Sequence, residues 1–263
     1  MTRPRGLLAA FTAVVAMATL VLPSRPARAD NAPLFTPEQK TAIEQLVKGY
    51  IMAHPEIVQE ALLELDKRQK EAENAAVKTA LKTESKAIYD TEAGTVVGNP
   101  GGDVTLVEFF DYNCPYCRKA MTTLDALLKS DPKLRIVLRD LPIVHPPESI
   151  EAAKIALAAK NQLSPEKFWD FHKKLFSASR LVAKAQALQV AKESGLDMAR
   201  LEKDAESDAV KAALTDSDRL SQLLNLRGTP AFVLGDDVVF GAQEDDEMKA
   251  QIAAVRQCGR TVC

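Results

Sequence analysis

Cysteine, glycine and aromatic residues are scarce in this sequence of 263 residues. Its four cysteines are too few for a small disulfide-rich protein, although they are unevenly distributed. It has only 11 glycines, and aromatic residues make up 5% of the chain. The fractions of hydrophobic and charged residues, 46% and 27%, are those of a globular protein and exclude a disordered or collagen-like chain. The length allows one large domain or two ordinary ones.

Long hydrophobic runs are absent after the extreme N-terminus. The one such run, Leu7–Leu22, is shorter than the roughly 20 residues that span a bilayer, which excludes a polytopic membrane protein and disfavours an uncleaved anchor. Arg3 and Arg5 precede this run, and Ala27-Arg28-Ala29 offers small residues at the two positions that a signal peptidase reads. We therefore expect residues 1–29 to be a signal peptide that is cleaved after Ala29 on export.

Neither sign of charge dominates the sequence. It has 34 lysines and arginines against 36 acidic residues. Loss of the signal peptide would remove four arginines and no acidic residue, which leaves a net charge of about −6. A mildly acidic surface argues against nucleic acid or an anionic membrane as a partner. Export to an oxidising compartment would also allow cysteine pairs to form disulfides.

Residues 36–90 show helical patterns and no strand pattern. Thr36-Pro37-Glu38-Gln39 is a capping box with proline at the first helical position, so a helix is expected to begin there. An apolar stripe follows at helical spacing, and its members are Ile43, Leu46, Val47, Tyr50 and Ile51. A second stripe opens at Val58. Because the segment cannot bury two stripes on itself, it either docks on the main domain or pairs with copies from other chains.

The remaining sequence alternates between strand and helix patterns. Thr91–Gly102 is rich in glycine and is expected to be a boundary or a turn-rich entry. The elements expected after it are a strand at 104–110, a helix at 115–130, a strand at 134–139, a helical block at 149–226, a hairpin at 231–240 and a last helix at about 244–256. This order favours an α/β core with a helical insertion.

Cys114-Pro115-Tyr116-Cys117 lies where the strand at 104–110 gives way to a helix. A cysteine at a helix N-terminus has its negative charge favoured by backbone N–H groups and by the helix dipole. Since the thiolate is the reactive species, Cys114 is predicted to be the nucleophile. Cys117, one turn further along the helix, can attack a mixed disulfide formed on Cys114. The motif therefore predicts thiol–disulfide exchange.

Two structural alternatives compete with redox chemistry. A Cys-x-x-Cys pair can be half of a zinc site, and Cys258 and Cys263 could complete four ligands. The x₄ spacing of that second pair and an oxidising compartment argue against zinc, and we expect no metal. The other alternative is an inert structural disulfide between Cys114 and Cys117. A helix N-terminus directly after a hydrophobic strand favours the redox interpretation.

Glu108 lies six residues before the first cysteine of the motif. Strand alternation places it on the same face as Leu106 and Phe110, so its carboxyl is expected to be partly buried. Burial would raise its pKa and let it relay the proton of Cys117. The alternative is a carboxylate at the strand end that reaches water.

The stretch Phe109–Cys117, with Glu108 before it, resembles the thioredoxin-like DsbA family of bacterial periplasmic proteins. Phe168-Trp169-Asp170-Phe171-His172 is similar to the inserted helical domain of that family, and Arg227-Gly228-Thr229-Pro230 is similar to its cis-proline loop. The resemblance covers about residues 96–256. It implies a thioredoxin fold at 91–263, with the helical insertion at about 146–226.

The resemblance also implies roles for individual residues. Cys114 would be the attacking thiol, Cys117 the resolving thiol and Glu108 the buried acid. The residues implied to face the substrate are Thr229, Pro230, Pro115 and Tyr116. Whether the bond before Pro230 is cis cannot be read from the sequence. No cofactor is expected beyond the redox-active pair Cys114–Cys117.

The helical segment at 30–90 is similar to the N-terminal extension of the ScsC and Com1-like branch, where it oligomerises the protein. In that branch, assembly favours disulfide isomerisation. The resemblance therefore implies a periplasmic isomerase or reductase that acts on cysteine-containing proteins as a homo-oligomer. Its redox partner in the membrane would be a DsbD-like reductase. A DsbA-like oxidase, served by a DsbB-like partner, is the first alternative.

Cys258 and Cys263 lie outside the pattern of the family. Their short spacing in an exported chain favours a structural disulfide. A second redox relay, or thiols that bind copper in a metal-tolerance protein, is the alternative for this pair.

Overall fold

The computed structural model describes residues 34–90, 92–178 and 180–263, so the predicted signal peptide at 1–29 lies outside the described residues. The described residues up to Glu60 form one compact unit, and Ala61–Cys263 form a second. Among the described residues, no helix is both long enough and apolar enough to cross a membrane.

Helix α1 (Pro37–Ala53) begins at the predicted capping box. Gln39 N donates to Thr36 Oγ1 at 3.3 Å, and Thr36 N donates to Gln39 Oε1 at 2.9 Å, which confirms both halves of the box. No residue of α1 is buried, and Leu46 of the apolar stripe is 72% exposed. The stripe is therefore not buried within its own unit.

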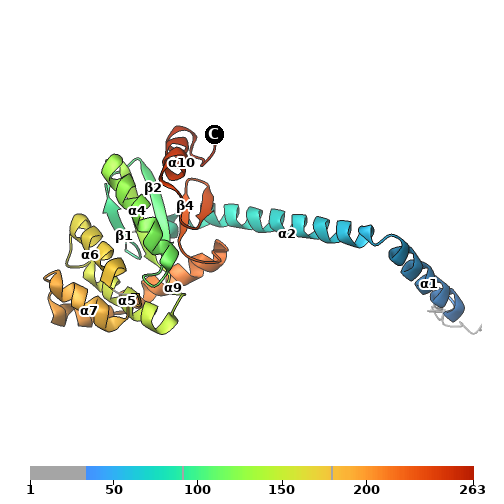
Figure 1. Ribbon diagram of the computed structural model, residues 1–263, viewed down its shortest axis with the longest axis horizontal. Helices are drawn as coiled ribbons and strands as arrows, with labels where there is room; N and C mark the ends of the chain where they lie inside the picture. Colours follow the sequence, from blue (N-terminus) through green and yellow to red (C-terminus); the bar gives the residue numbers. More distant parts are fainter. Residues whose placement is uncertain (1–33, 91, 179) are drawn as a thin grey trace, which may run out of the picture. The chain divides into compact units, whose positions relative to one another are not determined.

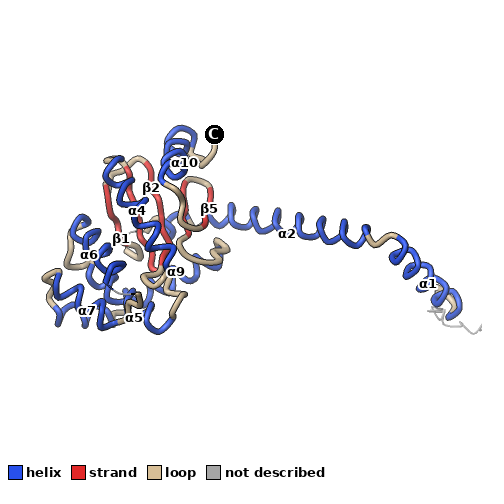
Figure 2. Tube along the Cα trace, viewed as in Figure 1, coloured by secondary structure: helices blue, strands red, loops and turns tan. Residues whose placement is uncertain are grey.

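The second unit is built on a five-stranded sheet with the order β1-β3-β2-β4-β5. Its strands are β1 (Thr95–Gly98), β2 (Val104–Phe110), β3 (Leu134–Asp140), β4 (Ala231–Leu234) and β5 (Asp237–Phe240). Strands β2 and β3 are parallel, and the other neighbours are antiparallel. Figures 1 and 2 show β2 near the middle of this unit.

Strand β1 corrects the prediction that Thr91–Gly102 is only a turn-rich boundary. Residues Thr95–Gly98 pair with β3 along one edge of the sheet. The strand has four residues and ends at Gly98, whose φ of 75° lies in the left-handed region. So short a strand among glycines gives too few alternating positions to be distinguished from a turn.

Helices cover both faces of the sheet. On one face, α4 (Pro115–Ser130) and α10 (Asp245–Cys258) pack on a core that includes Leu106 and Phe232. On the other face, the end of α2 (Glu56–Thr83), α3 (Ser85–Ile88) and α9 (Asp208–Leu223) cover Phe109 and Val137. Between β3 and β4 the chain inserts α5 (Pro146–Ala159), α6 (Pro165–Ala178), α7 (Lys184–Glu193), α8 (Met198–Ala205) and α9.

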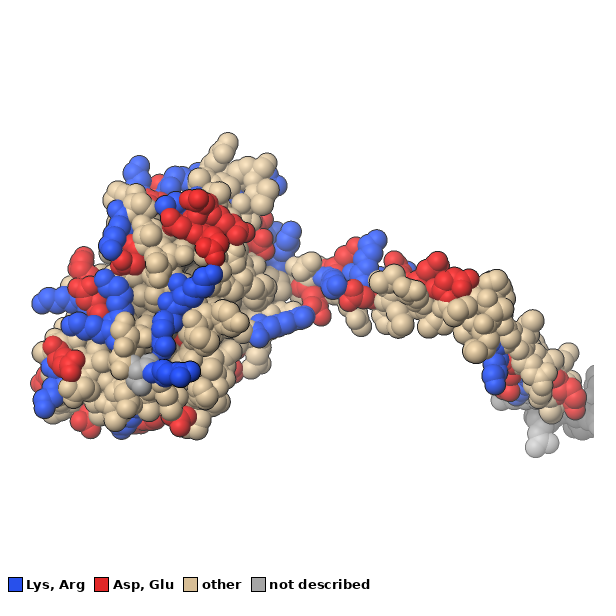
Figure 3. All heavy atoms as spheres, in the orientation of Figure 1, with Lys and Arg blue, Asp and Glu red and all other residues tan. Residues whose placement is uncertain are grey.

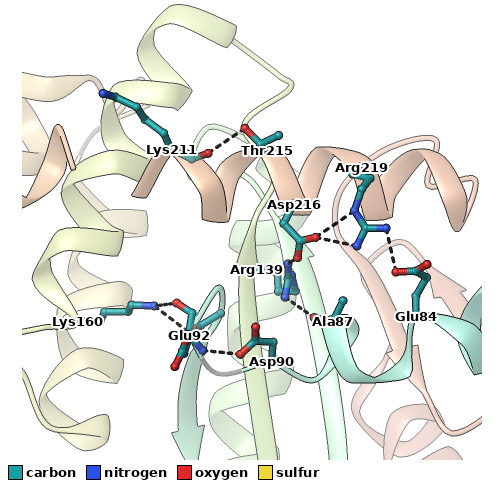
Figure 4. A network of polar contacts seen from close by, with 11 residues as sticks. Glu84, Ala87, Asp90, Glu92, Arg139, Lys160, Lys211, Thr215, Asp216 and Arg219 are labelled. Carbon is teal, nitrogen blue, oxygen red and sulfur yellow. Dashed lines mark hydrogen bonds and ion pairs between the residues drawn. The ribbon is translucent and has the colours of Figure 1, made fainter. Parts of the chain in front are cut away.

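A polar network fastens α3 and α9 to the sheet (Figure 4). The buried Arg139 of β3 donates to Ala87 O at 2.8 Å and pairs with Asp216 of α9. Arg219 bridges Asp216 at 2.8 Å and Glu84 at 2.9 Å. Arg139 and Asp140 are neighbours on β3, so their side chains point to opposite faces of the sheet.

Candidate active site

The loop between β2 and α4 is fixed by one buried carboxylate. Asp111 Oδ1 accepts hydrogen bonds from Asn113 N and from Ser149 Oγ, both at 2.8 Å. Asp111 Oδ2 accepts from Val144 N, also at 2.8 Å. The sequence did not single out Asp111, since only the contact with the inserted helices gives it this role. It holds the turn that delivers Cys114 to the start of α4.

Cys114 is the N-cap residue of α4, and Pro115 occupies the first turn. Both Cys114 and Cys117 are free thiols, 3% and 0% exposed. The pKa of Cys114 is lowered to about 6, chiefly by a hydrogen bond from Cys117, and backbone groups of Cys117 and Tyr116 add to this against the effect of burial. Burial instead raises the pKa of Cys117. Cys114 is therefore the sulfur that ionises near neutral pH.

The loop at Thr229–Pro230 faces the first sulfur. Cys114 Sγ lies 3.0 Å from Thr229 O, in a geometry in which the thiol donates to the carbonyl. The Thr229–Pro230 peptide bond is cis, which answers the question that the sequence left open. The structure thus brings together the dithiol and the two loop residues, which are more than 110 positions apart in the sequence.

A cavity of about 630 Å³ opens at the Thr229–Pro230 loop. Tyr116, which is 65% exposed, lines it together with Thr229 and Pro230. Its other lining residues include Phe240 on β5 and Val77 on α2. Glu73 on α2 is also at the rim, where its carboxylate accepts from Arg227 Nη2 at 2.7 Å. The α2 side of the cavity had no signal in the sequence.

Glu108 is completely buried on β2. Neither of its carboxyl oxygens has a hydrogen-bond partner among the described residues. Burial, followed by the charges of Cys114 and Asp140, raises its pKa to about 8. The alternative of a carboxylate that reaches water at the strand end is therefore wrong, and burial is more complete than the sequence predicted.

An aromatic cluster supports the turn before the cysteines. Tyr112, buried between Phe110 and Phe176, has its hydroxyl 2.8 Å from His172 Nδ1. Burial lowers the pKa of His172 to about 3, so its imidazole is neutral at physiological pH. The histidine is a packing partner of Tyr112 on α6.

Cys258 and Cys263 are joined in a disulfide at the end of α10 and do not line the cavity. Their sulfurs are therefore unavailable as thiolate ligands in this state, which weakens the hypothesis of a four-thiol metal site. Within the described part of the chain, no group of three or more histidine, cysteine or acidic residues is arranged to hold a metal ion.

Comparison with known families agrees with this geometry. The family model described as "DSBA-like thioredoxin domain" matches residues 105–253. The chain therefore belongs to the DsbA-like thioredoxin family, and its fold is a thioredoxin fold with an inserted helical region. A second model, "Copper resistance protein ScsC N-terminal domain", matches residues 39–72, which places the chain with the ScsC-like branch.

Solved structures and curated relatives extend the comparison. A thioredoxin-like oxidoreductase from Silicibacter pomeroyi is 39% identical, with a TM-score of 0.62 over 66% of this chain and 98% of that one. ScsC of Proteus mirabilis in a transitional conformation is 25% identical, with a TM-score of 0.61 over 85% of this chain and 98% of that one. The Na⁺/H⁺ antiporter NhaA 1 of Salinispora arenicola is 28% identical over 63% of this chain. The chain spans only 25% of the length of that antiporter.

Proposed function

We propose that this protein is a periplasmic thiol–disulfide oxidoreductase that acts on cysteine-containing proteins. The observation that carries the proposal is the dithiol itself, in which two neighbouring thiols have opposite pKa shifts. An acidic thiol is a good nucleophile and leaving group near neutral pH, whereas a buried thiol of raised pKa holds its proton until the resolving step. No cofactor is needed, because the two sulfurs carry the electrons.

In the reductive direction, the Cys114 thiolate attacks a substrate disulfide. The substrate S–S bond breaks, one substrate thiolate leaves, and a mixed disulfide forms on Cys114. Cys117 then gives its proton to Glu108 and attacks Cys114 Sγ, which releases the second substrate thiolate. The substrate gains two electrons, and the enzyme is left with a Cys114–Cys117 disulfide. Oxidation of a substrate dithiol is the reverse sequence.

Formation of the mixed disulfide makes Glu108 more available as a base. The negative charge of the Cys114 thiolate is one of the causes that raise the pKa of Glu108. When that sulfur is bound in a mixed disulfide, its charge is gone and the pKa of Glu108 falls. The carboxylate is therefore a more available base at the step in which Cys117 must lose its proton.

The cavity beside Thr229 and Pro230 supports a polypeptide substrate. It is bordered by β5, an edge strand of the sheet, which can pair with an extended segment. Tyr116 and Phe240, 65% and 50% exposed, offer apolar surface at the cavity. On the viewed face of the second unit, acidic and basic side chains are interspersed (Figure 3).

The N-terminal helices support the isomerase or reductase direction over the oxidase alternative. The uncovered stripe of α1 is a surface that copies of the chain can bury against one another. The match of residues 39–72 to the ScsC N-terminal domain points the same way. A reduced dithiol is needed for isomerisation, so a DsbD-like membrane reductase would be the partner that restores it.

Two assays on the mature chain test the proposal. Reduction of insulin by wild type should be lost in Cys114→Ser and retained in a variant in which Cys258 and Cys263 are both serine. Refolding of scrambled ribonuclease separates isomerase from oxidase, because only an isomerase recovers activity from a substrate with no free thiols. Absence of insulin reduction by wild type would contradict the proposed activity.

A further inference from the structure

A second buried carboxyl group lies beside Glu108 on the neighbouring strand. Asp140 is the last residue of β3, and it pairs with Phe110 in the register that pairs Glu108 with Leu138. Glu108 and Asp140 are therefore on the same face of the sheet, one strand and two positions apart. From ordinary strand spacing, this separates their Cα atoms by about 8 Å.

Asp140 is nearly as buried as Glu108. It is 4% exposed, and its Oδ1 has no hydrogen-bond partner among the described residues. Burial raises its pKa to about 8, with Lys160 opposing that shift. A buried carboxyl without full hydrogen bonding is costly for stability, which is a reason to look for a role in chemistry.

The charged and titratable groups around Asp140 come from four places. Lys160 at the end of α5 has an attractive charge, and its ammonium group is held by Gly94 O at 3.2 Å and by Glu92 O. Asp111 in the active-site loop repels it, and Arg139 on the other face of β3 weakly attracts it. Glu108 and Tyr112 of the β2 side complete the set, since the charge of Asp140 raises the pKa of both.

We propose that Asp140 is a positioning residue for the resolving step, and that with Glu108 it forms a coupled pair of buried acids that carries at most one negative charge near neutral pH. Two carboxylates in a region of low dielectric constant strongly disfavour simultaneous ionisation. A charge on Asp140 keeps the proton on Glu108. A neutral Asp140 allows Glu108 to ionise and to accept the Cys117 proton.

Through this coupling, the ionisation of Glu108 depends on the surroundings of Asp140, which include Lys160, as well as on the dithiol. The role in the resolving step rests on the proposed function, whereas the coupling between the two acids does not. The proton that Cys117 gives up is accepted by Glu108, so the step is balanced.

The test is a ¹³C NMR titration of the glutamate side-chain carboxyls in the oxidised, full-length mature protein. Oxidation removes the Cys114 thiolate, so that Asp140 is the charge that remains among the causes raising the pKa of Glu108. For acids whose Cα atoms are about 8 Å apart, Asp140→Asn should lower the pKa of Glu108 by roughly one to two units. Glu202→Gln, at an exposed position on α8, is the matched control and should leave it unchanged.

The reciprocal variant guards against a misfolded Asp140→Asn protein. Glu108→Gln should lower the pKa of Asp140 by a similar amount, read from labelled aspartate. Unchanged pKa values for both Glu108 in folded Asp140→Asn and Asp140 in folded Glu108→Gln would overturn the coupling. In the reduced protein, the rate of mixed-disulfide resolution should then have a shifted pH profile in Asp140→Asn. If the wild type does not reduce insulin, the proposed function is wrong, but the coupling measured by the titration is unaffected.

Discussion

Cys114 and Cys117 occupy the same helical turn, yet their surroundings move their pKa values in opposite directions. The largest cause for Cys114 is the hydrogen bond from Cys117 rather than the helix backbone. The reactivity of the first sulfur therefore depends on the second. The difference in pKa between the two thiols therefore arises from the contacts of the individual side chains.

Cys117→Ser tests this dependence. A serine hydroxyl cannot form the same hydrogen bond to the sulfur without moving closer, so the pKa of Cys114 should rise from about 6 towards its ordinary value of 9.0. The pH dependence of Cys114 alkylation by iodoacetamide measures the shift. The variant with serine at both 258 and 263 is the control, and an unchanged midpoint in Cys117→Ser would assign the acidity to the helix instead.

Glu108 should also affect stability. Its pKa is about 8 in the folded chain against an ordinary value of 4.5, so the folded protein keeps a proton that the unfolded chain loses. The folded state therefore loses stability through Glu108 as the pH rises from 4.5 towards 8. Glu108→Gln should raise the free energy of unfolding of the reduced protein by about 3 kcal/mol at about pH 7, and by much less at about pH 5.

Urea unfolding of wild type, Glu108→Gln and the exposed control Glu202→Gln at those two pH values measures this effect. Equal stabilities of wild type and Glu108→Gln at both values would mean that Glu108 is ionised in the folded protein.

Much of the site at the residue scale was predictable from sequence. The Cys-x-x-Cys motif after a hydrophobic strand indicates which thiols react, because the helix N-terminus follows from local pattern alone. Asp111 and Asp140 were missed for a physical reason. The role of Asp111 arises from contacts with Ser149 and Val144, and that of Asp140 from strand register, neither of which has a local signal.

At the scale of elements, the strands and helices that carry the dithiol follow from hydrophobic periodicity and proline positions. Strand β1 did not, because four residues bounded by glycine have no resolvable period. The contribution of α2 to the cavity was also unpredictable. It depends on how Glu73 and Val77 dock beside the Thr229–Pro230 loop.

The ion pair of Glu73 and Arg227 should influence substrate binding. Glu73→Ala removes the 2.7 Å contact that ties α2 to the loop before Thr229. We expect the KM for a peptide disulfide substrate to rise about two- to fivefold with little change in kcat, in line with an exposed pair. Glu64→Ala, which removes a similar exposed pair with Arg68 elsewhere on α2, is the control. A fall in kcat without a change in KM would argue that α2 acts on the dithiol instead.

At the scale of the whole molecule, the two units differ in the roles proposed for them. The second unit contains every residue of the proposed chemistry, whereas the first presents an apolar stripe with nothing buried on it. The sequence predicted the stripe from its spacing. It could not decide between docking and assembly, because both bury the same residues.

Leu46→Asp tests assembly. A charge in the centre of the stripe should convert an oligomer to a monomer, measured by light scattering of the mature chain, and should reduce isomerase activity while insulin reduction persists. Gln45→Asp places the same charge next to the stripe on α1 and should leave the mass unchanged. A wild-type protein that is already monomeric would contradict the role given to α1.

Cys114 and Cys117 are expected to form a reversible redox pair, which a glutathione redox titration followed by mass spectrometry of peptides measures. We expect one two-electron transition, in which the peptide that contains both cysteines loses its two thiol hydrogens, while the Cys258–Cys263 disulfide stays intact across that transition. The proposed pair is wrong if Cys114 and Cys117 remain unpaired throughout, or if either one pairs with Cys258 or Cys263.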